Sequence, residues 1–480
     1  MRYAISCGHQ LTAWAAEEAL RAGGNALDGA IAAFAMSWVT EPCMSGPGGG
    51  GFALVHHEGR MRAMDFFTQT PINKRPVEEI EFVPVEVDFG GARDVFHIGH
   101  GSAAVPGAVH GIFTLHQMGA RMPMTDLFAP AIQVAREGHP IGPFQHHDFV
   151  LLQDIVRYAV KGRELYFDGD TLKPVGAQIF VPQLADFMEH LAREGADAFY
   201  RGEVAVRIAE ACAQRGGHLI PEDLAAYRTK VGRARLFTGQ QYHIHTANQP
   251  SVGGKLLIAI LEASARHLAE GREANEAMAR AIRDVYDLRD QWFTPGEHIK
   301  LGGTSHLNVI DHQQNVVSLS MSIGEGSGFF VEGTEIHMNN MLGEANLLPD
   351  GLHTWRPATR LKSMMAPSIC TATGSDRLIA LGSGGSWRIP FMIAQVLNRI
   401  LHHRQELSAS IAAPRMQLDH DVWQVEPGHA RPSHIDAKNW NEWEEQNLYF
   451  GGVHTAMFYQ NQYQAVGDDR RYGVAAVNNA

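Results

Sequence analysis

The sequence predicts a mixed α/β fold in which paired strands lie inside and helices cover them. Alanine-rich stretches with helical spacing occupy the first part of the chain, at 11–20, 26–39 and 126–137. Apolar alternating runs bounded by turn residues fill much of the final third, at 304–311 and 315–322. Because helices and sheets bury their apolar faces against each other, this order is typical of layered packing.

The first helices and the first strand are separated by glycine-rich turns. Gly23-Gly24-Asn25 stops the helix at 11–20, and the next helix, at 26–39, is apolar enough to be mostly buried. The loop at 46–51 then runs into residues 52–55, which are typical of a buried strand. Since this loop lacks a Gly-Lys-Ser/Thr ending, we expect a close-packed turn rather than a phosphate-binding loop.

The remaining chain alternates between the two periodicities. Helices are predicted at 204–214, 221–227 and 390–403, and strand structure at 233–246 and 369–381. The sequence contains no internal repeat, low-complexity segment or linker that would separate domains. We therefore expect one compact unit.

Composition and charge narrow the classes of function. The chain has 480 residues, 45% hydrophobic and 19% charged, so it is long enough to bury a large core. Its net charge of -12 and the lack of a dense Lys/Arg run argue against nucleic acid as a partner. We expect a small-molecule substrate and no cofactor.

The spacing of the cysteines and the length of the apolar runs indicate the expected cellular location. Cys7, Cys43, Cys212 and Cys370 lie far apart without a Cys-x-x-Cys pair, so we expect buried apolar thiols rather than disulfides or a zinc site. The N-terminus lacks a secretory leader pattern, and the strongest apolar run, at 30–39, is too short to span a bilayer. A cytoplasmic protein without a membrane partner is the expectation, although a removed leader is not excluded.

The most informative feature is a threonine placed where a flexible turn enters a strand. Gly302-Gly303-Thr304-Ser305-His306 leads into the alternating stretch 307–311. If the chain breaks between Gly303 and Thr304, the threonine gains an α-amine that titrates near 8 and serves as the base for its own hydroxyl. The glycines permit the strained turn that this cleavage needs. By itself, however, the pattern is more often an ordinary turn.

A set of further motifs supports the interpretation of Thr304 as a nucleophile. They follow one another as Gly23-Gly24-Asn25-Ala26-Leu27-Asp28, Glu41-Pro42, Ser45-Gly46-Pro47-Gly48-Gly49-Gly50-Gly51-Phe52, Val105-Pro106-Gly107, Phe199-Tyr200-Arg201-Gly202-Glu203, Leu224-Ala225-Ala226-Tyr227, Thr304-Ser305-His306, Gly382-Ser383-Gly384-Gly385-Ser386 and Asp469-Arg470-Arg471. Through these motifs, and over almost its whole length, the chain resembles the γ-glutamyltranspeptidase family of N-terminal nucleophile hydrolases.

The resemblance implies an α/β (α+β) fold of a particular kind, the four-layer αββα sandwich, made from one autocleaved precursor. Residues 1–303 would form the large fragment and residues 304–480 the small fragment, which carries the nucleophile at its N-terminus. Together the fragments would make one compact domain and associate as a heterodimer. A dimer of such heterodimers stays open.

The resemblance also implies catalytic roles. Thr304 would cleave the Gly303–Thr304 bond and then act as the nucleophile, and Ser322 stands where the family has a threonine that hydrogen-bonds it. Gly384 and Gly385 match the paired glycines whose backbone N–H groups face the developing oxyanion. Loss of one such donor costs on the order of 3 kcal/mol in other enzymes.

The positions expected to bind the substrate differ from the family pattern. Phe67 replaces the arginine that clamps the α-carboxylate of a γ-glutamyl group, so a bidentate cation has become an apolar ring. The other positions implied by the resemblance are Gly324 and Met341, where the family has side-chain amides, Glu344 for an aspartate, Ser363, which is retained, and Met364 for a serine. A carboxylate that had lost its cation would cost several kcal/mol to desolvate.

These departures favour an amide-cleaving site with an apolar acyl pocket, as in relatives such as cephalosporin acylases. The predicted function is a self-processing threonine amidohydrolase or acyltransferase that acts through an acyl-enzyme ester. An alternative is a true γ-glutamyltransferase, or glutathione hydrolase, with a relocated clamp; the candidate cations are Arg62, Arg356, Arg360 and Arg388.

Two other classes remain open. His243 and His245 would lie on one face of a strand, a spacing used by metal-dependent amidohydrolases, but no His-Glu-x-x-His motif or carboxylate cluster accompanies them. The chain could also be an uncleaved, non-catalytic binding protein with an eroded pocket.

Overall fold

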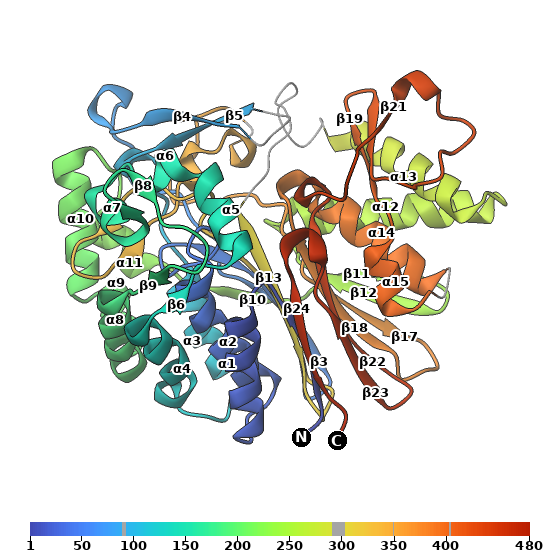
Figure 1. The fold of residues 1–480 in the computed structure, drawn as a ribbon, viewed down its shortest axis with the longest axis horizontal. Coiled ribbons are helices and arrows are strands. Elements are labelled where there is room, and N and C mark those ends of the chain that lie inside the picture. The colour runs from blue at the N-terminus through green and yellow to red at the C-terminus, as the bar shows by residue number, and fades with distance from the viewer. Residues whose placement is uncertain (89–92, 290–302, 349, 403–404) are drawn as a thin grey trace.

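Two β-sheets packed face to face form the centre of the molecule, and helices cover both outer faces (Figure 1). The computed structural model describes residues 1–88, 93–289, 303–348, 350–402 and 405–480. The first sheet has the strand order β10-β3-β2-β14-β13-β1-β24. Its strands are β10 (Lys230–Gly232), β3 (Arg60–Asp65), β2 (Gly50–His57), β14 (Val316–Ser322), β13 (Thr304–Ile310), β1 (Tyr3–Cys7) and β24 (Val474–Asn478).

The second sheet has the order β11-β12-β17-β18-β22-β23, and all of its pairings are antiparallel. Its strands are β11 (Arg235–Thr238), β12 (Tyr242–Thr246), β17 (Ser368–Ala372), β18 (Leu378–Gly384), β22 (Gly452–Tyr459) and β23 (Gln462–Val466). An apolar cluster that includes Ala4, Leu54 and Ile310 from the first sheet and Ala380 and Phe458 from the second fills the space between the sheets. This cluster is the inner core of the sandwich.

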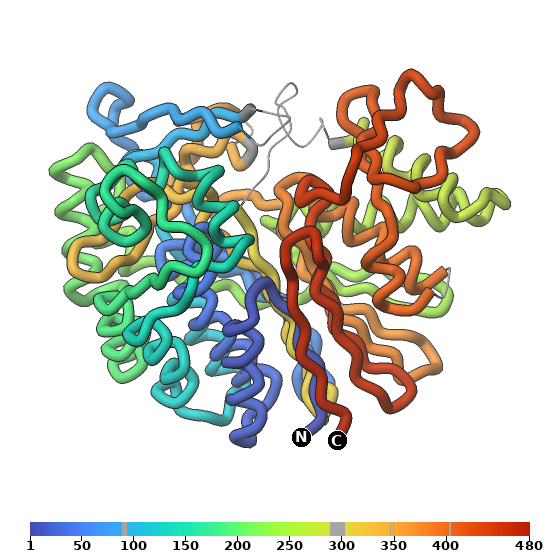
Figure 2. The backbone as a smooth tube through the Cα atoms, in the orientation of Figure 1, coloured from blue at the N-terminus to red at the C-terminus, as the bar shows by residue number. Residues whose placement is uncertain are grey.

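One helical layer covers each outer face (Figures 1 and 2). Helices α1 (Gln10–Arg21) and α2 (Ala26–Thr40) lie on the first sheet, and α4 (Met124–Glu137) packs against α2. Helices α12 (Val252–Ala269) and α14 (Ile389–Leu401) lie on the second sheet, and α13 (Ala274–Arg289) packs against α12. Asn25 caps α2 through a reciprocal pair of bonds with Asp28, which fixes the position at which the buried helix begins.

Shorter elements complete the chain. The other helices are α3 (Ala108–Gln117), α5 (Pro143–Leu151), α6 (Gln153–Val156), α7 (Val160–Tyr166), α8 (Pro182–Glu194), α9 (Asp197–Tyr200), α10 (Glu203–Arg215), α11 (Pro221–Ala226) and α15 (Leu407–Ala412). The other strands are β4 (Val83–Asp88), β5 (Arg93–Ile98), β6 (His139–Pro140), β7 (Phe167–Asp168), β8 (Thr171–Leu172), β9 (Gln178–Ile179), β15 (Phe330–Val331), β16 (Ile336–His337), β19 (Met416–Asp419), β20 (Val422–Val425) and β21 (Trp440–Glu442).

The predicted αββα class and its main helices are confirmed, with ends that differ by one or two residues. The glycine-rich loop is also a close-packed turn, since a Cβ at Gly51 would lie 2.1 Å from the Ser320 carbonyl oxygen. The stretch at 369–381 proves to be two paired strands, β17 and β18. Strands β1, β3, β10, β22, β23 and β24 of the two sheets were not predicted from the sequence.

The four cysteines are buried and unbridged, as predicted. None of the helices within the described ranges combines the length and the apolar character that a membrane crossing requires.

Candidate active site at the start of β13

Strand alternation decides which way Thr304 faces. On β13, Leu307 and Val309 pack into the helix-side core, whereas Ile310 belongs to the core between the sheets. His306 lies against the second sheet, because a Cβ at Gly382 would be 2.2 Å from its ring. By the same period of two, Thr304 faces the second sheet from the end of its strand, and it is only 7% exposed.

The peptide before Thr304 is held from two sides. The Ser322 hydroxyl, directly across the β13–β14 pair, donates a hydrogen bond of 2.5 Å to the Gly303 carbonyl oxygen. The same hydroxyl accepts a bond of 2.9 Å from the Gly324 N–H, which fixes the direction of its proton. The Gly303 N–H donates to the Glu325 carboxyl group at 2.9 Å. The bond that the sequence analysis singles out is therefore fixed in position by two side chains.

The paired glycines come from the second sheet. A Cβ at Gly384 would lie 2.4 Å from the Thr304 carbonyl oxygen and 2.9 Å from Nη1 of Arg471. The backbone at Gly385 has φ +115°, a conformation that L side chains rarely adopt. The fold thus brings Gly384 into contact with the backbone of Thr304, and the requirement for glycine is physical at both positions.

Ser305 and His306 have structural contacts. The Ser305 hydroxyl faces the helix side and donates to the buried Glu41 carboxyl group, which also accepts from Thr12. Burial lowers the pKa of His306 to about 3, so its ring is neutral at physiological pH. Its ring makes hydrogen bonds to Ser320 on the neighbouring strand β14 and to Asn308 on its own strand. These bonds set the position of β13 rather than reach a substrate.

Several ionisable side chains that the sequence analysis did not identify lie beside Gly303. A small cavity of about 30 Å³ is lined by Gly303, Glu325, Asp148 and Arg471, among others. Burial, with help from Glu344, raises the pKa of Glu325 well above its usual range. Burial also raises the pKa of Asp148 to about 7, against the opposing effect of Arg471. The site can therefore hold neutral carboxylic acids near neutral pH.

Of the two arginines in the C-terminal motif Asp469-Arg470-Arg471, only Arg471 lies at this site. Arg470 is committed to a buried network with Glu426, at 2.6 Å, and Asp468, at 3.2 Å. The Arg471 guanidinium lies against Gly384, and burial lowers its pKa. The motif Asp469-Arg470-Arg471 gave no sign that its last residue adjoins Thr304, because the two are joined only by the tertiary fold.

The six predicted substrate positions fall into three groups. Phe67 and Met341 are buried in one apolar cluster, and Phe67 stacks on Phe52 at 5.6 Å between ring centroids. Gly324 lies against Glu344, since a Cβ there would be 2.2 Å from a Glu344 carboxyl oxygen. Gly324 donates its N–H to Ser322, and the Phe67 backbone lies against Gly50, the residue paired with Ser322 on β2.

The third group is Ser363 and Met364, which lie where α12 begins. The Ser363 carbonyl accepts the Val252 N–H at 2.8 Å. A Cβ at Gly253 would lie 1.9 Å from the Met364 carbonyl oxygen. The Met364 side chain packs against the same apolar cluster as Phe67.

Of the four arginines considered for a relocated clamp, two are bound to other protein groups and two lie elsewhere. Arg360 pairs with Asp65 at 3.1 Å and donates to the Phe67 carbonyl at 2.8 Å. Arg388 is fully buried and donates to the Tyr449 carbonyl at 2.7 Å. Arg62 lines a different cavity together with β2 and the end of α3, and Arg356 is exposed.

His243 and His245 lie on β12 of the second sheet. Across the residues that the structure describes, no group of three or more His, Cys, Asp or Glu side chains is placed to hold a metal ion. The two histidines are thus not accompanied by the further ligands that such a site needs.

A family profile described as Gamma-glutamyltranspeptidase matches residues 12–294 and 264–478. The chain belongs to the γ-glutamyltranspeptidase family. Within the family it is similar to a glutathione hydrolase proenzyme of Pseudomonas aeruginosa, with 26% identity covering 86% of this chain and 82% of that protein. It is also similar to the acylase ACY 1 proenzyme of a Pseudomonas species, with 27% identity covering 88% and 83%.

The fold comparison agrees with this membership. A crystal structure of cephalosporin acylase from Bacillus halodurans matches with a TM-score of 0.80 and 22% identity, covering 99% of this chain and 95% of that one. At 22% identity, this similarity shows a shared fold and nothing more specific.

Proposed function

We propose that this family member is a self-processing, N-terminal-threonine amidohydrolase or acyltransferase with an acyl pocket altered from strict γ-glutamyl recognition. The observation that carries the proposal is the hydrogen bond from the Ser322 hydroxyl to the Gly303 carbonyl oxygen, directly before a threonine that begins a central strand. The two fragments would be residues 1–303 and 304–480, associated as a heterodimer.

Maturation follows from this geometry. The Thr304 hydroxyl oxygen attacks the Gly303 carbonyl carbon, and the Ser322 hydroxyl stabilises the negative charge that develops on the carbonyl oxygen. The C–N bond breaks as the Thr304 nitrogen takes up the proton that the hydroxyl has lost, which leaves Gly303 as an ester on the threonine oxygen. Water then hydrolyses the ester, and Thr304 becomes a free N-terminus.

Turnover repeats the same chemistry on a substrate amide. The free α-amine takes the proton of the Thr304 hydroxyl, whose oxygen attacks the amide carbon, and the leaving amine departs with a proton. Backbone N–H groups at Gly384 and Gly385 are the proposed oxyanion donors. The acyl ester is released to water, or to a second amine in transfer.

The first test is Thr304→Ala. We expect a single folded chain without processing or amide turnover, because the substitution removes the hydroxyl that attacks in both reactions. Mass spectrometry of wild-type protein should find a new C-terminus at Gly303 and a new N-terminus at Thr304. A cleaved or active Thr304→Ala protein would overturn the assignment.

The second test concerns the acyl pocket. Phe67 and Met341 share an apolar cluster, so a substrate carboxylate there would lose hydration without gaining a cation. We expect poor hydrolysis of a γ-glutamyl anilide by the wild type, improved about tenfold or more by Phe67→Arg. Phe52→Arg, on the ring that stacks on Phe67, is the matched control and should bring no gain.

The rival functions predict other results. Rapid wild-type hydrolysis of the γ-glutamyl anilide would favour the γ-glutamyltransferase with a relocated clamp. An intact chain on a denaturing gel, without turnover of γ-glutamyl, glutaryl and neutral amides, would favour the uncleaved binding protein.

A further inference from the structure

A cavity of about 360 Å³ lies where the hairpin of β2 and β3 meets the end of helix α3. It has no part in the reaction derived above. Gly50, at the start of β2, pairs with Ser322, whereas the cavity lies at the other end of this strand. At about 3.3 Å per residue, the strand places its turn roughly 20 Å from Gly50. The cavity is therefore separate from the candidate active site.

Strand pairing places the basic side chains of the hairpin on one face. Next to the tight turn, His57 pairs with Arg60. Two residues further from the turn, Val55 pairs with Arg62. Val55 belongs to the helix-side core, and strand residues two positions apart share a face. Arg60 and Arg62 therefore lie on the helix side of the sheet, where they line the cavity.

The loop after α3 closes the cavity by packing on His57. A Cβ at Gly119 would lie 2.4 Å from Nε2 of the His57 ring, so glycine is needed for this approach. The other ring nitrogen, Nδ1, is 3.1 Å from Oδ1 of Asn315, whose amide nitrogen donates to Asp311. Because the Asn315 oxygen can only accept, Nδ1 carries a proton and donates it. The ring is thus fixed in position at the wall.

Arg121 adds a third guanidinium group from the loop after α3. The Asp28 carboxylate accepts the backbone N–H groups of Arg121 and Met122, each at 2.9 Å, and so anchors this loop. The Arg121 guanidinium donates to the amide oxygen of Gln313 at 2.7 Å. Since this partner is neutral, the hydrogen bond leaves the positive charge of Arg121 uncompensated.

The wall of the cavity is basic although the protein is acidic. Across the described residues, the guanidinium groups of Arg60 and Arg62 have neither an ion-pair nor a hydrogen-bond partner. Together with Arg121 they face the single carboxylate of Glu58, in a chain whose net charge is -12. Like charges around one cavity repel each other, and a bound anion would relieve that repulsion.

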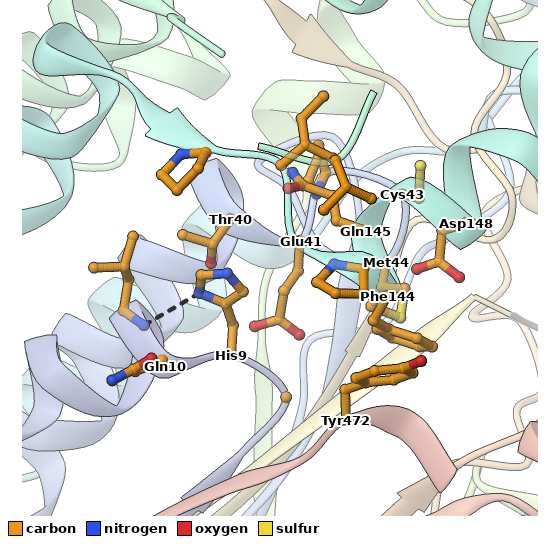
Figure 3. A pocket seen from close by; sticks show the side chains of 18 of the residues that line it. His9, Gln10, Thr40, Glu41, Cys43, Met44, Phe144, Gln145, Asp148 and Tyr472 are labelled. Atoms are coloured by element: carbon orange, nitrogen blue, oxygen red, sulfur yellow. Dashed lines mark hydrogen bonds between the residues drawn. The ribbon is translucent and has the colours of Figure 1, made fainter. Parts of the chain in front are cut away.

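The cavity beside the candidate active site has the opposite character. Its volume is about 590 Å³, and the carboxyl groups of Glu41 and Asp148 lie on its wall (Figure 3). Within the described chain, no Lys or Arg lines it. A basic wall is therefore not a general property of the cavities in this protein.

We propose that the cavity between the β2–β3 hairpin and the end of α3 is an anion site that binds a small phosphate compound, such as a phosphate monoester or a diphosphate. Guanidinium groups bind phosphate oxygens through pairs of parallel hydrogen bonds, and three of them line this cavity. Binding does not depend on the proposed function, because none of the proposed catalytic residues lines this cavity.

Calorimetry with pyrophosphate on the full-length protein, at constant ionic strength, tests the site. We expect one pyrophosphate per chain, bound at least tenfold more tightly than malonate, which offers fewer oxygens and less charge. Arg62→Gln should weaken pyrophosphate binding about tenfold because it removes one guanidinium group, and Arg60→Gln should have the same effect. Arg163→Gln, at an exposed position on α7, removes the same charge elsewhere and should leave binding unchanged.

Thermal unfolding separates a ligand-binding role from a structural one. Without ligand, Arg62→Gln should melt at or above the wild-type temperature, because its side chain has no partner to lose. Pyrophosphate should raise the melting temperature of the wild type and of Arg163→Gln, and should raise that of Arg62→Gln less.

Four binding results would overturn the proposal. They are no binding by the wild type, several pyrophosphates per chain, equal binding of malonate, and equal losses in Arg62→Gln and Arg163→Gln. A lowered melting temperature of Arg62→Gln without ligand would assign the side chain to the fold and would also overturn it. An unprocessed protein that binds pyrophosphate would retain this site and remove the proposed function alone.

Discussion

At the scale of single residues, Ser322 donates directly to the carbonyl oxygen of the bond that we propose is cleaved. Its hydroxyl has one proton, and the Gly324 N–H occupies one of its lone pairs, so that proton points to the Gly303 oxygen. The family pattern places a threonine there, and the serine retains the same hydroxyl without the methyl group. We therefore expect the hydroxyl, rather than the residue type, to be what processing requires at this position.

We predict that Ser322→Ala slows processing about a hundredfold, because one oxyanion donor is lost. Ser322→Thr should process at a rate close to that of the wild type, since it keeps the hydroxyl. Time courses of fragment appearance on denaturing gels measure both rates. Equal rates for wild type and Ser322→Ala would contradict this role.

The sequence located some of these residues but not others. Thr304 and Gly384 stand within motifs that resemble those of the family, and Ser322 was identified by its place eighteen residues after Thr304 in the same resemblance. Glu325, Asp148 and Arg471 could not, because they meet Gly303 only after separate elements fold onto one another. The roles of the motif residues still rest on the experiments above.

At the scale of elements, β13 and β18 form the site by approaching each other at their ends. The approach is close because Gly384 has no side chain between its backbone and the Thr304 carbonyl. Gly384 is the last residue of β18, and it is followed directly by Gly385 in the left-handed conformation. The chain must turn away from the first sheet at that point.

Gly384→Ala tests this approach. The new Cβ would meet the Thr304 carbonyl oxygen at 2.4 Å, so we expect a loss of about 1–3 kcal/mol in the free energy of unfolding and little or no processing. Gly232→Ala, on β10 at the sheet edge, is the matched control because nothing lies within 4 Å of its Cβ. Chemical denaturation and gel analysis measure both effects. Normal processing by Gly384→Ala would refute the close approach.

The sequence analysis identified some elements and missed others, among them the long helices α12 and α13 and the terminal strands β1 and β24. Helix α2 is apolar on every side and buried on every side, so its sequence pattern was sufficient. In β24, Val474–Asn478, every side chain is partly or wholly exposed, and so it carries little apolar signal. Its strand character comes from pairing with β1, a partner more than 400 residues away by number.

At the scale of the whole molecule, the layered class followed from the sequence because it depends on which segments are apolar and in what order. The strand order of the sheets did not, since it depends on long-range pairing. β1 lies between β13 and β24, so the first sheet alternates segments from the two sides of residue 303.

This interleaving has a consequence for any attempt to make the halves separately. The portion before residue 304 would lack the middle strands of its own sheet, and the remainder would present β13 and β24 with the strand between them missing. Unpaired backbone amides along those gaps favour aggregation over folding. Synthesis as one polypeptide lets each half template the other, so a later cut could change the chemistry of Thr304 without releasing either half.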